Sequence, residues 1–117
     1  MKIKGIVTAV AAVSALITGT PIAHADDVTG IVKARTQRTS APNLASQHSG
    51  PEIQAWWKPG VAVDLECSVH GQAVKGYFSR YLPNGGWDDL WYRTPSGDYI
   101  ADVDIETHTN NSVTPSC

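Results

Sequence analysis

The sequence predicts an all-β domain, a small barrel of about five short strands, and three observations favour this fold. Residues 61–69 and 99–105 alternate between apolar and polar side chains, which is the pattern of half-buried strands. Turns containing Gly, Pro or Asn separate the β-prone segments. After residue 25 no segment shows the 3.6-residue period of an amphipathic helix. A barrel is expected over a sandwich because it leaves the fewest unpaired strand edges.

The first strand is expected over residues 31–35. Residues 36–51 follow as an irregular stretch rich in Thr, Ser, Asn, Gly and Pro, and a loop of this length in a small domain is usually functional or disordered. A second β-prone segment, residues 53–57, ends at a turn over residues 58–60, where Pro and Gly supply the turn conformation. The chain therefore enters its core strands only after a long connection.

The clearest strand spans residues 61–69, and turns are expected at residues 70–73 and 83–86. A tight turn at residues 95–98 predicts a hairpin between its flanking aromatic segments. In the strand at 61–69 the inward residues are expected to be Val61, Val63, Leu65 and Cys67. In the strand at 99–105 we expect Tyr99, Ala101, Val103 and Ile105 to face inward and Ile100, Asp102 and Asp104 to face outward.

Residues 1–25 have the pattern of a cleaved export signal. Lys2 and Lys4 precede an apolar run over residues 6–17, and Ala23-His24-Ala25 has the small-x-small form of a cleavage site. The apolar run is shorter than the ~20 residues that span a bilayer. The mature chain is then predicted to be secreted and to retain 117 − 25 = 92 residues.

These 92 residues (117 − 25) are expected to form one domain, residues 26–117, with its core over about 30–106 and a tail over 107–117. Without the two signal lysines the chain has 7 basic and 11 acidic residues, a net charge of 7 − 11 = −4. This charge disfavours binding to nucleic acid or to an anionic membrane. We expect a soluble monomer after signal cleavage.

The chain has two cysteines, Cys67 and Cys117, and in an oxidising compartment they are expected to form a disulfide. The bridge would close a loop of 117 − 67 + 1 = 51 residues and hold the polar tail on the domain. A competing interpretation is a zinc site, in which Cys67-x-x-His70 is completed by His108 and Cys117. Structural zinc sites usually have two tightly spaced pairs, and only one is present here.

No catalytic motif is recognisable. The sequence has no Gly-x-Ser-x-Gly elbow, no His-Glu-x-x-His and no glycine-rich phosphate loop. Three histidines of the mature chain, His48, His70 and His108, are interpreted as solvated loop residues. Asp102, Asp104 and Glu106 are interpreted as a charged outer strand face, with a calcium site as the alternative. We therefore expect no enzyme, no cofactor and no metal.

Aromatic side chains are the strongest functional indication, because four tryptophans are many for a chain of this length. Tyr and Trp are enriched at binding surfaces. Trp56 and Trp57 are adjacent, so in a strand they point to opposite faces, and one of them can lie outside the core. The candidate binding residues are Trp57, Tyr81, Trp87, Trp91 and Tyr92, with Arg35 and Asp88 (beside Asp89) to orient a polar ligand.

The chain also resembles a known family. The resemblance rests on Val32-Lys33-Ala34-Arg35, on residues 56–67 with their Pro-Gly turn and Val-x-Val-x-Leu-x-Cys strand, and on residues 91–102. This order is similar to that of bacterial Src-homology-3-like (SH3-like) domains, especially small exported ones of actinomycetes, and covers about residues 30–117. Two features depart from that family: Thr36-Gln37 stands where a Gly-Pro is usual, and the segment 76–91 is longer.

The resemblance implies an SH3-like barrel that binds cell-wall peptide or glycan. The leading hypothesis is thus a secreted, non-enzymatic binding module that recognises cell-wall peptide or glycan, or an extracellular protein, through surface aromatics. The alternative is a secreted inhibitor or effector that acts on an extracellular enzyme through the loop at residues 36–51.

Overall fold

The computed structural model describes residues 28–117, so the predicted export signal lies outside the described residues. This part of the chain forms eight short strands, one α-helix and four 3-10 turns. The strands are β2 (Val28–Val32), β3 (Thr36–Gln37), β4 (Trp56–Trp57), β5 (Ala62–Leu65), β6 (Cys67–Val74), β7 (Asp88–Arg93), β8 (Tyr99–Ala101) and β9 (Ile105–Glu106). The helical elements are α1 (Glu52–Ala55), η2 (Leu44–Ser46), η3 (Tyr77–Tyr81), η4 (Asn84–Gly86) and η5 (Asp102–Asp104). The β-rich class is as expected.

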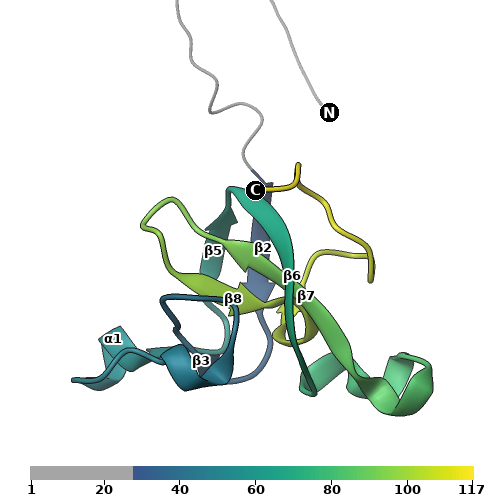
Figure 1. Ribbon diagram of the computed structural model, residues 1–117, viewed down its shortest axis with the longest axis horizontal. Helices are drawn as coiled ribbons and strands as arrows, with labels where there is room; N and C mark the ends of the chain where they lie inside the picture. The colour runs from purple at the N-terminus through teal and green to yellow at the C-terminus, as the bar shows by residue number, and fades with distance from the viewer. Residues whose placement is uncertain (1–27) are drawn as a thin grey trace, which may run out of the picture.

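The strands form three antiparallel sheets, ordered β5-β2-β9, β3-β4 and β6-β7-β8, and no closed barrel joins them in the described part of the chain. Only one residue, Glu66, separates β5 from β6, so a nearly continuous stretch of extended chain passes from one sheet to another. Later in the chain, η5 separates β8 from β9, and these two strands belong to different sheets. Figure 1 shows β6 and β7 crossing the middle of the molecule.

The strand expected at residues 61–69 is divided, and the turn expected at residues 70–73 is not a chain reversal. Val63, Leu65 and Cys67 face inward as predicted, but Val61 is exposed. β6 continues through residues 70–73 because it pairs with β7 on both sides of an irregularity in the register between His70 and Val74. The Gly-containing sequence marks that irregularity.

The hairpin at residues 95–98 is present, with Tyr92 opposite Ile100. β7 is buried on both faces because residues 28–117 form two hydrophobic clusters, one on each side of the sheet β6-β7-β8. The first contains Val32, Trp57, Val63, Leu65, Leu90, Tyr92, Ile100 and Ile105. The second contains Val74, Trp91, Ala101 and Val103, with Phe78 and Leu82 packed against it. The segment η3–η4 therefore covers the second cluster.

The alternation expected at residues 99–105 is wrong at its outward positions. Ile100, Asp102 and Asp104 are all buried, because η5 replaces strand geometry at residues 102–104 and both faces of the preceding strand are covered. The strand expected at residues 31–35 ends at Val32, which leaves Arg35 in the short connection to β3.

The predicted disulfide between Cys67 and Cys117 is formed, with the two Cα atoms 4.9 Å apart. Backbone hydrogen bonds add to it: the Ser68 N–H donates to the Pro115 carbonyl at 2.9 Å, and the Cys117 N–H donates to the Ser68 carbonyl at 2.8 Å. The C-terminal tail is thus fixed beside β6. Among residues 28–117 there is no helix with the length and apolar character needed to cross a bilayer.

Candidate functional site

Two tryptophans line a groove of about 590 Å³ between the segments that carry β4 and η4. Trp56 comes from β4, and Trp87 stands between η4 and β7. The buried side chains of Val74 and Ala101 form part of the lining between them. The volume lies within the 300–1,000 Å³ that is usual for ligand sites. Figure 1 shows α1, which leads into β4, at the left, and the green segment that carries η3 and η4 at the right.

Trp56 is held by a cation on its ring. The Arg35 guanidinium carbon lies 3.5 Å from the ring centroid. The same guanidinium donates two hydrogen bonds to Glu52, at 2.8 and 3.0 Å, and the Arg35 hydrogen bond lowers the pKa of the Glu52 carboxyl. Because Arg35 already has a carboxylate partner, it fixes Trp56 in place and contributes little free positive charge to the groove.

Trp87 is the more accessible of the two tryptophans that line the groove, with 57% of its surface exposed. Lys75 lies with its ammonium nitrogen 4.9 Å from the Trp87 ring centroid, and no salt bridge to Lys75 occurs within residues 28–117. Leu44 of η2 adds an exposed apolar side chain to the same groove. The groove therefore offers two indole faces and one lysine ammonium group, a combination that suits a polar ligand with apolar ring or chain surfaces.

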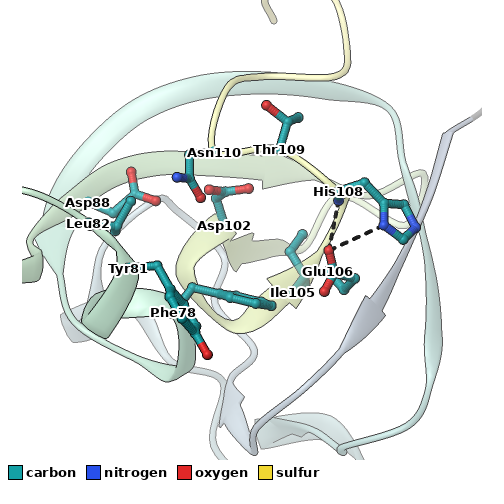
Figure 2. A pocket seen from close by; sticks show the side chains of 10 residues that line it. All are labelled: Phe78, Tyr81, Leu82, Asp88, Asp102, Ile105, Glu106, His108, Thr109 and Asn110. Carbon is teal, nitrogen blue, oxygen red and sulfur yellow. Dashed lines mark hydrogen bonds and ion pairs between the residues drawn. The ribbon is translucent and has the colours of Figure 1, made fainter.

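A second pocket, of about 400 Å³, lies between η3, η5 and the C-terminal tail. Figure 2 shows the carboxyl groups of Asp88 and Asp102 near the Asn110 amide on one side of this pocket, and the Phe78 and Tyr81 side chains on the other. Glu106 accepts a hydrogen bond from the His108 backbone N–H at 2.9 Å at the far end. We refer to this as the carboxyl pocket.

The carboxyl pocket contains a protonated acid at neutral pH. Burial, followed by the hydrogen bond and the negative charge of the neighbouring Asp88, raises the pKa of Asp102 to about 9. Only 5% of Asp102 is exposed. Since two adjacent carboxylates in a buried site repel each other, the pair retains one proton.

Asp104, two residues further on, has a structural role. It is buried, which raises its pKa, although hydrogen bonds from the Tyr77 backbone and from Thr36 act in the opposite direction. The Tyr77 N–H donates to Asp104 Oδ1 at 2.9 Å and so ties the start of η3 to η5. Gly76 allows this approach, because a Cβ atom there would overlap the Asp104 carboxylate.

The structure divides the predicted binding residues into three groups. Arg35 and Trp87 line the groove, and Tyr81 and Asp88 line the carboxyl pocket. Trp57, Trp91 and Tyr92 are core residues, with exposures of 9%, 1% and 0%. Trp91 and Tyr92 are buried too deeply to contact a ligand, which corrects the expectation that they belong to a binding surface, and Trp57 lines neither the groove nor the carboxyl pocket.

The buried aromatics have internal partners for their polar atoms. The Trp57 indole N–H donates to the Tyr99 carbonyl at 3.1 Å, and the Trp91 indole N–H donates to the Gln72 carbonyl at 2.8 Å. Of the adjacent tryptophans, Trp57 is therefore inside and Trp56 lines the groove. The sequence indicated that the two would point to opposite faces, and the one named as a candidate binding residue, Trp57, is the buried member of the pair.

The interpretations based on metals do not match the geometry. Cys67 and Cys117 are bonded to each other, so neither is free to be the thiolate ligand of the zinc alternative. The calcium alternative required Asp102, Asp104 and Glu106 along one strand face, and η5 removes that face. Residues 28–117 contain no group of three or more His, Cys, Asp or Glu side chains arranged to hold a metal ion.

The histidines lie in ordinary polar contacts. His48 Nε2 is 2.6 Å from Asp98 Oδ1, and Arg38 donates to the other oxygen of Asp98 at 2.7 Å. Burial acts to raise the pKa of Asp98, but the hydrogen bonds from Arg38 and His48 outweigh it and lower that pKa. The cluster fastens the segment at residues 36–51 to the β7–β8 hairpin. His70 pairs with Asp89 at 2.8 Å on the surface.

Comparison with known proteins gives no relative, since no protein-family model, no curated protein and no solved structure matches this chain.

Proposed function

We propose that this chain is a secreted, non-enzymatic binding module that recognises cell-wall glycan or its attached peptide through the groove between Trp56 and Trp87. The observation that carries the proposal is the pairing of two groove-lining indoles, each with a cation over its ring. Sugar rings and peptide side chains stack on such indole faces, and aromatic residues dominate the energetics of binding surfaces.

The chemical groups of cell-wall glycan and peptide match the charge of the groove. Lys75 supplies a cation without a carboxylate partner in the described chain, whereas Arg35 is paired with Glu52. Wall peptides carry carboxylate groups, and sugars carry hydroxyls that accept hydrogen bonds from an ammonium group. Stacking on Trp87 combined with a hydrogen bond from Lys75 gives both affinity and orientation to one ligand.

Secretion and the SH3-like fold are part of this proposal. The disulfide between Cys67 and Cys117 supports an oxidising compartment, which agrees with the export signal expected at residues 1–25. The SH3-like arrangement is supported by the continuous stretch β5–β6, which serves two sheets, and by the turn η5, which leads into a last strand paired with the first. The small β domain then acts by itself as a binding module.

The proposal is tested by sedimentation of the purified chain with insoluble peptidoglycan. We expect wild type to co-sediment and Trp87→Ala to lose roughly 5- to 150-fold in affinity, because stacking on one aromatic ring contributes roughly 1–3 kcal/mol. Trp56→Ala should have a similar effect. Ile53→Ala is the matched control, since Ile53 is an exposed apolar residue that does not line the groove. Wild type that stays in solution rules out the wall ligand, and equal binding by all four proteins rules out the groove as its site.

The alternative is an inhibitor or effector that presents residues 36–51 to an extracellular enzyme. Its support is weaker because this segment is fastened to the domain: Thr39 is fully buried, the Gln72 N–H of β6 donates to the Pro42 carbonyl at 3.0 Å, and Pro42 packs where Gly71 has no side chain. Leu44 is exposed, but it points its apolar surface toward the groove. Loss of inhibition after cleavage within residues 40–47, with no wall binding, favours this alternative.

A further inference from the structure

We propose that the carboxyl pocket binds a primary ammonium group, with Asp88 and Asp102 as its hydrogen-bond acceptors and the aromatic residues of η3 beside it. This site is separate from the groove between Trp56 and Trp87, because the two cavities share no lining residue. The inference therefore does not depend on the proposed wall ligand.

The first argument is the set of unused acceptors. Asp102 Oδ1 and Asp88 Oδ2 are buried, and apart from the proton that the two carboxyl groups share, neither oxygen has a hydrogen-bond donor in the described chain. Asp88 Oδ1, in contrast, accepts from the Leu90 N–H at 3.0 Å. Buried carboxylate oxygens without a donor are costly, because the lost hydration is not replaced. An ammonium group has three N–H donors and can satisfy both oxygens at once.

The second argument is the chemistry of the remaining lining. Phe78 and Tyr81 place aromatic rings on the side opposite the carboxyl groups (Figure 2), and such rings attract cations. Arg80 lies 5.7 Å from the Tyr81 ring centroid but does not line the pocket. The position inside the pocket that faces both carboxyls is open to an outside cation.

A divalent metal is a poorer occupant than an ammonium group. The described residues contain no group of three His, Cys, Asp or Glu side chains arranged around one metal position. Calcium takes six to eight oxygen ligands and magnesium requires octahedral geometry, whereas an ammonium group needs only the acceptors that Asp88, Asp102 and the Asn110 amide oxygen offer. The pocket therefore matches a monovalent organic cation.

Binding at this site should release a proton. The pair of carboxyls retains one proton at neutral pH, as described above, and an ammonium group takes the place of that proton. The other titratable groups that face the pocket are Tyr81 from η3, Glu106 from β9 and His108 from the tail. Glu106 is engaged by the His108 backbone, so the proton is assigned to Asp88 and Asp102.

The test uses isothermal titration calorimetry with Nα-acetyl-lysine amide as the probe. We expect the dissociation constant to fall roughly tenfold per pH unit between about pH 6 and 8, since one proton is displaced for each ligand bound. Titrations in two buffers of different ionisation enthalpy should report about one proton released at neutral pH. Nα,Nε-diacetyl-lysine amide, which has the same shape near the backbone but no ammonium group, should not bind.

Variants separate the pocket from the general surface charge. Asp102→Asn should abolish both binding and proton release, and Asp88→Asn gives a second, independent change if the first variant fails to fold. Asp89→Asn is the matched control, because it removes the same charge one residue away, outside the pocket. Trp56→Ala should leave amine binding unchanged, which distinguishes this proposal from the groove.

A comparison with glucosamine identifies the source of the ammonium group: tighter binding of glucosamine indicates an amino sugar, and tighter binding of the lysine derivative indicates a peptide side chain. Failure of wild type to bind either probe overturns the proposal. So do binding that survives in Asp102→Asn, equal binding of Nα,Nε-diacetyl-lysine amide, or an affinity that is independent of pH with no proton released.

Discussion

Replacing Asp102 by asparagine should change how the stability of the fold depends on pH. In the folded chain the pKa of Asp102 is raised to about 9 from the ordinary value of 3.8, first by burial and then by Asp88. Between these two values the folded chain holds a proton that the unfolded chain has released. The free energy of unfolding therefore falls as pH rises, and the loss is complete only above the folded pKa.

The size of the effect follows from one proton. A single group that is protonated when folded and ionised when unfolded changes the free energy of unfolding by about 1.4 kcal/mol per pH unit. Between about pH 6 and 8 wild type should thus lose roughly 3 kcal/mol. Asparagine has nearly the same shape and no ionisable proton, so Asp102→Asn should lose much less over the same interval.

The assay is reversible urea unfolding of both proteins at these two pH values, with the disulfide intact. The quantity to compare is the change in the free energy of unfolding per pH unit. Asp104 also has a raised pKa and lowers the free energy of unfolding with rising pH in both proteins, so only the difference between them reports on Asp102. Asp89→Asn changes an exposed residue next to Asp88 and should keep the pH dependence of the free energy of unfolding that wild type shows. Parallel pH profiles for wild type and Asp102→Asn would refute the assignment of a retained proton to this pair.

Other predictions concern the parts that hold the two cavities in place. Cys67→Ser combined with Cys117→Ser should lower the free energy of unfolding by up to about 4 kcal/mol, the chain-entropy estimate for a 51-residue loop, measured by urea unfolding against oxidised wild type. A loss below about 1 kcal/mol would show that the tail is held by its hydrogen bonds alone. Gly76→Ala should destabilise by roughly 1–3 kcal/mol because its Cβ overlaps the Asp104 carboxylate, and adding Asp104→Ala should make the two losses clearly less than additive in a double-mutant cycle. Tyr92→Phe should cost about 1 kcal/mol by removing the hydroxyl that accepts from the Val113 N–H at 3.1 Å, and unchanged stability would contradict that role.

Features that depend on residue counts and local turns were predictable from the sequence. The disulfide followed from two cysteines in a chain for which export was expected, and the hairpin at residues 95–98 followed from its turn composition. The opposite orientation of Trp56 and Trp57 also followed, since neighbouring strand residues alternate. Which of the two is buried depends on the carbonyl of Tyr99, 42 residues away, and a local pattern does not contain that information.

The predictions that were wrong also failed because they depended on contacts between residues far apart in the sequence. Asp102 and Asp104 look like an outward strand face because their alternation is regular, but η5 and the close approach of Gly76 turn them inward. The carboxyl pocket is assembled from η3, β7, η5, β9 and the tail, so its geometry depends on contacts between distant segments. Tyr81 and Asp88 were identified as candidates, but nothing in the sequence indicated that Asp102 faces Asp88.

The most direct test of the proposed function is the set of four indole N–H signals in a ¹H–¹⁵N NMR spectrum during titration with a soluble wall fragment. Trp56 and Trp87 line the groove, whereas Trp57 and Trp91 donate their indole N–H groups to buried carbonyls. We predict that the signals of Trp56 and Trp87 shift in a saturable way while those of Trp57 and Trp91 stay in place. Unchanged signals for Trp56 and Trp87 at saturating fragment, or equal shifts for all four, would contradict the groove as the binding site.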